Sequence, residues 1–228
     1  EEWVAFLYFI SKNYINFQDI EGKIHIKSLF LNNISILSAF NHFLYNSNEK
    51  LAKLDCNWCL ATHYYKKHEI RKEYHNNVLK LQDKQLYSIN NINYIINEIT
   101  SSYSKINFLI NTNCSYNDYI SCAILSIKLL DNNCIFYCKI PRFDNFTDEI
   151  KDVLLLYSLI FEESYIYSFD LKIQMNYLVC KNKKRISTES IYKKLLSSQN
   201  SSQNSSQNSS QNSYPLFLEE FKKENESW

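Results

Sequence analysis

Lys139 is the residue of this sequence best placed to do chemistry, because it directly follows the short apolar run Cys134–Cys138. That run is rich in residues that suit a strand covered on both faces of a sheet. A lysine at the end of such a strand can orient a hydroxyl nucleophile and stabilise developing negative charge if a neighbouring carboxylate sets its position. The alternative interpretation is a solvated lysine at the rim of a sheet.

A second candidate for chemistry is the pair Cys56 and Cys59, which His63 and His68 follow. Thiolates and imidazoles are the ligands that zinc prefers. Structural zinc sites, however, usually separate their two ligand pairs by about a dozen residues. Only three residues separate Cys59 from His63. We therefore expect no metal site and interpret Asp55–Thr62 as a strand.

The elements around Lys139 follow from hydrophobic spacing. Apolar residues at helical intervals predict a helix that begins at Asn117, and the polar triplet Asp131–Asn133 predicts the turn that ends it. Thr147 is placed to cap a second helix with an acidic first turn. Two short strands, Ser164–Ser168 and Tyr177–Cys180, have a connection too short for a crossover helix, so we expect them to pair antiparallel.

The preceding part of the chain completes the pattern. It predicts strands at 23–31, 55–62 and 105–110, with a helix at 34–45 between the first two. The fold class predicted is α/β and Rossmann-like, with a mostly parallel sheet that ends in an antiparallel hairpin and helices on both faces. This ending of the sheet is typical of the methyltransferase fold.

Two segments resemble one family. Cys134–Phe146 resembles the "GGxFVxKxFDxF" strand of the FtsJ-like RNA ribose 2′-O-methyltransferases, and Leu154–Cys180 resembles their closing segment "LLYLLxxxFExVxIxKPxxSRxxNSERYLVC". The cap-type branch is the most similar. The resemblance implies S-adenosylmethionine as cofactor, a ribose 2′-hydroxyl as methyl acceptor and a Lys-Asp-Lys-Glu set, of which Lys139 matches the second lysine.

The family's acidic positions carry other residues here. The aspartate that follows the fourth strand falls within Asn111, Thr112 and Asn113, and the glutamate of the closing segment matches Met175. Lys12 is a candidate for the first lysine. From these substitutions we expect no carboxylate within hydrogen-bond reach of the Lys139 ammonium.

The resemblance also implies a cofactor-binding turn after the first strand, at Phe30, Leu31, Asn32 and Asn33. Glycines normally stand in such a turn, because the backbone must adopt positive φ and approach the methionine part of the cofactor closely. The only glycine of the chain is Gly22. Asparagine tolerates left-handed backbone better than most residues, so the turn can still form.

Charge limits the kinds of partner. The net charge of +1 excludes a broad field for polyanions, so RNA contact would be local. Lys183, Lys184 and Arg185 form one basic run and are the predicted RNA contacts; another basic group lies within 66–72. Solvated surface is the alternative for both.

The cysteines and the N-terminal segment indicate the compartment. An odd count of seven cysteines, mostly within predicted core elements, favours an intracellular, reducing compartment. The apolar run Trp3–Ile10 is too short to span a bilayer and is interpreted as a core helix, so no membrane partner is expected. The absence of an initiator methionine suggests a piece of a longer protein.

Three segments are predicted. Residues 1–196 form the FtsJ-like domain with its core at 23–181, and 197–213, with four Ser-Ser-Gln-Asn copies, form a disordered insertion. Residues 214–228 begin a truncated helical segment.

Two functions remain open. The first is a catalytically impaired pseudo-methyltransferase that binds RNA, with capped mRNA as one candidate, or a protein partner such as another methyltransferase or capping subunit. The second is an active S-adenosylmethionine-dependent RNA 2′-O-methyltransferase that uses Lys139.

Overall fold

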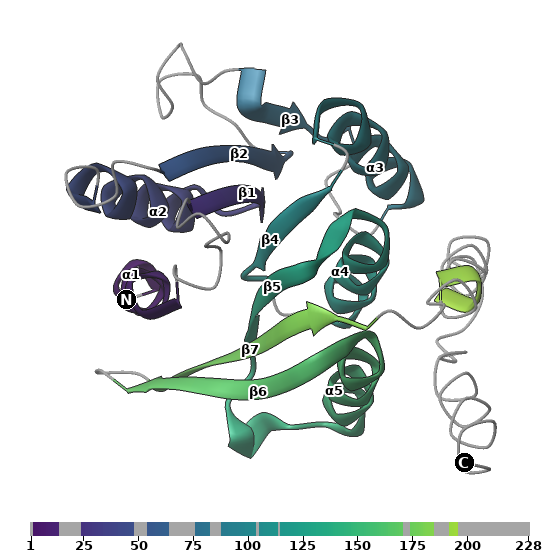
Figure 1. Cartoon of the computed structure of the whole chain (residues 1–228). Coiled ribbons are helices and arrows are strands. Elements are labelled where there is room, and N and C mark those ends of the chain that lie inside the picture. Colours follow the sequence, from purple (N-terminus) through teal and green to yellow (C-terminus); the bar gives the residue numbers. More distant parts are fainter. Residues whose placement is uncertain are drawn as a thin grey trace.

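The computed structural model contains one seven-stranded sheet in the order β3-β2-β1-β4-β5-β7-β6 (Figure 1). The structure describes residues 2–13, 24–47, 54–63, 76–82, 88–103, 105–113, 115–170, 174–184 and 192–195. His68, Arg185, the basic group within 66–72, the repeat tract 197–213 and the segment 214–228 lie outside the described residues.

Strands β1 to β5 pair in parallel with one another, and β7 pairs antiparallel with both β5 and β6. The strands are β1 (Ile24–Leu31), β2 (Leu54–Thr62), β3 (Val78–Lys80), β4 (Ile106–Asn111), β5 (Leu130–Ile140), β6 (Phe161–Asp170) and β7 (Gln174–Lys183). The predicted mostly parallel sheet with its closing antiparallel hairpin is confirmed.

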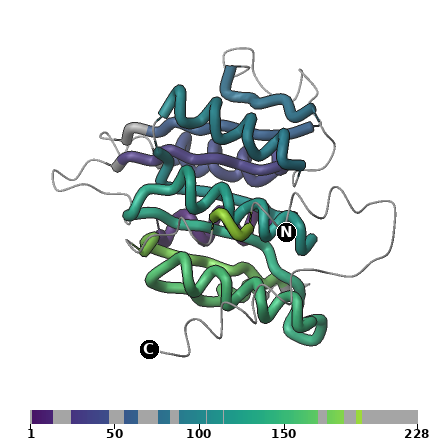
Figure 2. Tube along the Cα trace, turned by 90° about the vertical axis from the view of Figure 1, so that its right-hand side faces the viewer, coloured from purple at the N-terminus to yellow at the C-terminus, as the bar shows by residue number. Residues whose placement is uncertain are grey.

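Helices cover both faces of the sheet, as predicted. They are α1 (Glu2–Asn13), α2 (Ile34–Ser47), α3 (Ile89–Tyr103), α4 (Tyr116–Leu129) and α5 (Asp148–Ile160), with the short 3₁₀ helix η4 (Phe143–Asn145). Helices α1 and α2 lie on one face, and α3, α4 and α5 lie on the other, which faces the viewer in Figure 2. No described helix is long and apolar enough to cross a membrane.

The core on the α1 side is largely aromatic. Phe6 of α1 is fully buried, stacks on Phe108 of β4 at 6.1 Å between ring centroids and meets Tyr137 of β5 edge-on at 5.4 Å. Phe9 packs beside it, 4.5 Å from the ring of Tyr137. The interpretation of the N-terminal apolar run as a core helix is confirmed, and these contacts fix α1 against the middle of the sheet.

The predicted turn at Asp131–Asn133 is wrong. Helix α4 ends at Leu129 and β5 begins at Leu130, so these three exposed residues belong to the strand. Between the pairs Ile106–Leu130 and Phe108–Ile135, β4 advances by two residues while β5 advances by five. The three extra residues of β5 are the polar triplet, which bulges into solvent because β4 has no residues to pair with it.

Helix α5 begins where the sequence predicted. Thr147 occupies its N-cap position, and the Thr147 carbonyl accepts the N–H groups of Ile150 and Lys151 at 3.1 and 3.2 Å. The Thr147 side chain makes no capping hydrogen bond. The acidic first turn therefore stabilises this end of the helix mainly through its interaction with the helix dipole.

Candidate functional site

The order of the sheet places a switch point between β1 and β4. The chain crosses from β1 to β2 on one side and from β4 to β5 on the other, so the strand order reverses between β1 and β4. In open α/β sheets, ligands bind beyond the carboxyl ends of the strands at such a point. The turn after β1, the residues after β4 and Lys139 near the end of β5 all lie at this edge.

The turn after β1 contains an asparagine in left-handed backbone. Asn32 has a φ of 53°, and its N–H donates to the carbonyl of Ala61 in β2 at 2.9 Å. The expectation that asparagine can hold this turn in left-handed backbone is confirmed. Asn33 then caps α2, because its Oδ1 accepts the N–H of Ile36 at 2.9 Å and the hydroxyl of Ser35 at 2.7 Å.

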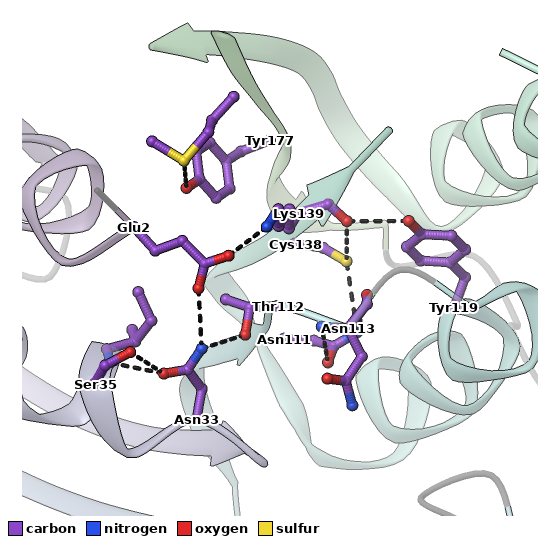
Figure 3. Close-up of polar contacts among 12 residues, drawn as sticks. Glu2, Asn33, Ser35, Asn111, Thr112, Asn113, Tyr119, Cys138, Lys139 and Tyr177 are labelled. Atoms are coloured by element: carbon purple, nitrogen blue, oxygen red, sulfur yellow. Dashed lines mark hydrogen bonds and ion pairs between the residues drawn. The ribbon is translucent and has the colours of Figure 1, made fainter. Parts of the chain in front are cut away.

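The side chain of Asn33 also bridges the switch point. Its Nδ2 donates to Oγ1 of Thr112, just after β4, at 2.5 Å and to Oε2 of Glu2 in α1 at 3.4 Å (Figure 3). One amide therefore connects the ends of two neighbouring strands to a helix that covers the sheet.

Lys139 forms an ion pair with Glu2. The Lys139 ammonium donates to Oε1 of Glu2, and the two side chains point toward each other in Figure 3. Their side chains are 31% and 29% exposed, so solvent reaches both. The expectation that no carboxylate lies within reach of Lys139 is wrong, because the acid comes from α1, 137 residues earlier in the chain. The backbone carbonyl of Lys139 accepts the hydroxyl of Tyr119 at 3.1 Å.

The substituted acid positions divide into two environments. Asn111 is fully buried beside the site, where its Oδ1 accepts the N–H of Asn113 at 3.1 Å and its Nδ2 lies 3.6 Å from the thiol of Cys138. Met175 instead lies in the aromatic core, where its sulfur accepts the hydroxyl of Tyr177 at 3.5 Å. Because Lys139 pairs with Tyr177 in the β5–β7 ladder, Met175 is a diagonal neighbour of Lys139 on the same face of the sheet. The Asn111 side chain lies on the opposite face, beside Cys138.

The other predicted site residues lie elsewhere. Phe30 and Leu31 are fully buried in the cores on opposite faces of the sheet. Lys12 lies at the far end of α1 from Glu2, with its ammonium 5.7 Å from the ring centroid of Tyr8. Ten helical positions correspond to about 15 Å along the axis, so Lys12 does not join the site.

The basic residues at the end of β7 cap helices. The Lys183 ammonium donates to the carbonyl of Ile127 at 3.2 Å and to that of Leu130, and Lys184 donates to the carbonyl of Ser158 at 2.8 Å. Burial lowers the pKa of Lys183 below the ordinary lysine value, and Lys105 adds to the effect. Because β7 runs antiparallel to β5, this group lies at the opposite edge of the sheet from Lys139.

The two cysteines of the zinc alternative lie on opposite faces of β2. Cys56 packs against the core on the α1 side, and Cys59 belongs to the core on the other side. Strand alternation separates them, so they cannot share one ion. Burial raises the pKa of Cys59 to about 12, which keeps the thiol protonated. The interpretation of this segment as a strand is confirmed.

Sequence reasoning missed Glu2 and the bridging role of Asn33. Asn33 carries a usable signal, since an asparagine directly before an apolar helical pattern is a typical N-cap. Glu2 carries none beyond its place in the first turn of a helix, because only the docking of α1 brings it to β5.

Comparisons with known proteins agree on the fold. No protein-family model matches the sequence, and no curated protein matches it. A protein assigned as a class I S-adenosylmethionine-dependent methyltransferase from Listeria monocytogenes is 7% identical, with a TM-score of 0.50 over 82% of this chain and 61% of that chain. This alignment covers less than two thirds of the Listeria protein.

Fibrillarins are also similar. The pre-rRNA processing fibrillarin of Methanococcus jannaschii is 11% identical, with a TM-score of 0.43 over 71% of this chain and 69% of its own. A fibrillarin in complex with Nop5p is 9% identical, with a TM-score of 0.44 over 79% and 83%. Identities this low concern the fold alone. The sheet order and the similarity to the Listeria protein together show that the chain has the Rossmann-like methyltransferase fold, as predicted.

The fold implies S-adenosylmethionine, but the turn after β1 does not fit it. The methionine part of the cofactor needs close approach of the backbone, which glycine permits and a side chain obstructs. Here the Asn33 side chain reaches from the turn to Thr112, and the Glu2 carboxylate lies beside it. Asn32 Oδ1, buried without a hydrogen-bond partner among the described residues, is an acceptor that a ligand could use. This one acceptor does not make the turn fit the cofactor, because the hydrogen bond from Asn33 to Thr112 remains.

Proposed function

We propose that the chain is a degenerate FtsJ-like, cap-type RNA ribose 2′-O-methyltransferase domain that acts as an RNA-binding scaffold and transfers no methyl group. The hydrogen bond from Asn33 to Thr112 across the switch point carries this proposal, since it lies where the methyl donor S-adenosylmethionine would bind. Binding of S-adenosylmethionine is therefore not expected. A protein partner, such as another methyltransferase or a capping subunit, would use the same scaffold.

Lys139 supports RNA as the ligand. It stands at the family's second lysine position, near the carboxyl end of β5, and its side chain remains partly exposed. With Glu2 it presents one donor and one acceptor, which suits a ribose hydroxyl. The pair is neutral as a unit, so RNA affinity should depend only weakly on salt.

An active RNA 2′-O-methyltransferase is the second candidate, and the Glu2 carboxylate favours it. In that case Glu2 would hold the Lys139 ammonium in place of the missing family acids, and Lys139 would orient the 2′-hydroxyl. This alternative requires that the Asn33 bridge open.

The surrounding assignments belong to the same proposal. Residues 1–196 would form the domain, 197–213 a disordered insertion and 214–228 the start of a further helical segment. An intracellular, reducing compartment suits the six cysteines of the described residues, five of which are buried.

Radiolabelled S-adenosylmethionine and capped RNA test the two candidates. The scaffold predicts no methyl incorporation and no cofactor binding, with RNA binding that Lys139→Met weakens and Lys151→Met, at an exposed lysine of α5, leaves unchanged. Methyl transfer that Lys139→Met abolishes would establish the enzyme instead. RNA binding unaffected by Lys139→Met would contradict a scaffold centred on this lysine.

A further inference from the structure

Two donors from distant elements converge on the carboxylate of Glu2. Lys139 of β5 donates to one oxygen, and Asn33 of the turn after β1 donates to the other (Figure 3). Both donors lie at the edge of the sheet where ligands bind in this fold. The described part of the chain thus holds a carboxylate of its own between the lysine and the cofactor turn.

The packing of α1 fixes this carboxylate. Phe6 and Phe9 are buried against β4 and β5, and the Trp3 ring lies 5.1 Å from that of His42 in α2. Glu2 is in the first turn of the same helix. Its position is therefore set by a well-packed helix and not only by the ion pair, which alone would contribute little at this exposure.

We propose that Glu2 is a built-in occupant of the site, standing where the carboxylate of an amino-acid ligand moiety would otherwise bind. The inference rests on the proposed function, in which the turn after β1 receives no cofactor. A ligand carboxylate would compete for Lys139 and Asn33 and would be repelled by Glu2. Asn33 blocks the turn by its size, and Glu2 excludes the ligand by its charge.

The two effects can be separated in an Asn33→Gly background. Glycine removes the amide that reaches Thr112 and is tolerated at an N-cap nearly as well as asparagine. Glu2→Ala is then added, with Glu163→Ala on the exposed part of β6 as the matched control. Circular dichroism and thermal unfolding confirm that each variant is folded.

Each variant is titrated with two probes by calorimetry. S-adenosylhomocysteine carries the amino-acid carboxylate, whereas 5′-methylthioadenosine lacks the amino-acid part. In the Asn33→Gly background, Glu2→Ala should raise affinity for S-adenosylhomocysteine by about tenfold or more, because one opposing charge and one competitor are removed. Affinity for 5′-methylthioadenosine should stay within about twofold, and Glu163→Ala should change neither.

Equal gains for both probes would overturn the proposal, because the effect would then be steric. A folded double variant that binds no S-adenosylhomocysteine would overturn it as well. Micromolar binding of S-adenosylhomocysteine to the wild-type chain is a different outcome, which would contradict the proposed function itself.

Discussion

Two lysines at opposite edges of the sheet show how differently one residue type is used. Lys139 meets a side-chain carboxylate that another helix supplies, and solvent still reaches the pair. Lys183 is half-buried, and its ammonium donates to backbone carbonyls at the end of α4. The lysine at the β5 end can interact with a ligand, whereas the one at the β7 end completes the hydrogen bonding of a helix terminus.

The comparison depends most on α1, which supplies Glu2 to the edge of the sheet where Lys139 lies. Phe6→Ala should lower the free energy of unfolding by about 3 to 5 kcal/mol, because it opens a cavity in the aromatic core. Denaturant unfolding measures the loss, with Val4→Ala on the exposed side of α1 as control. A loss below about 1 kcal/mol would show that α1 is not packed as described.

The same substitution at the two lysines compares their contributions to stability. Lys183→Met keeps the apolar stem but leaves the carbonyls of Ile127 and Leu130 without this donor, so unfolding free energy should fall by about 1 to 3 kcal/mol. Lys139→Met should change it by less than about 1 kcal/mol, because the ion pair is partly exposed. If both variants lost the same stability, the distinction between the two edges would be lost.

Alkaline pH should lower the free energy of unfolding because of Cys134, a buried thiol near Lys183. Burial raises the pKa of Cys134 to about 12, although Lys183 partly opposes the shift. A thiol in the unfolded chain has a pKa of about 8.5, so the unfolded state loses its proton first and stability falls as pH rises between these values. Cys134→Ala should remove about 1 to 2 kcal/mol of that loss at pH 10. Denaturant unfolding measures the free energy of both proteins between about pH 8 and pH 10. If the free energies of Cys134→Ala and wild type fell in parallel, the role given to Cys134 would be contradicted.

The smallest effect is expected at Glu2. Glu2→Gln keeps the size of the side chain and removes its charge, so the unfolding free energy should change by no more than about 0.5 kcal/mol. The same denaturant experiment measures it. A loss above about 2 kcal/mol would mean that the Glu2 carboxylate holds the fold together, and its proposed place as a ligand substitute would fail.

The sequence predicted the elements better than it predicted the site. Hydrophobic period and turn residues located α2, α5 and the β6–β7 hairpin, because these patterns follow from local burial. They misplaced Asp131–Asn133, since a bulged strand and a turn have the same polar composition. The partner of Lys139 and the helix-capping role of Lys183 could not be predicted, because the acceptor of each ammonium comes from a segment distant in sequence.

Calorimetric titration of the wild-type chain with S-adenosylhomocysteine tests the central claim most directly. With Asn33 on Thr112 and Glu2 between Asn33 and Lys139, we predict no saturable heat up to about 1 mM ligand. A saturable isotherm with a dissociation constant in the micromolar range would contradict the account.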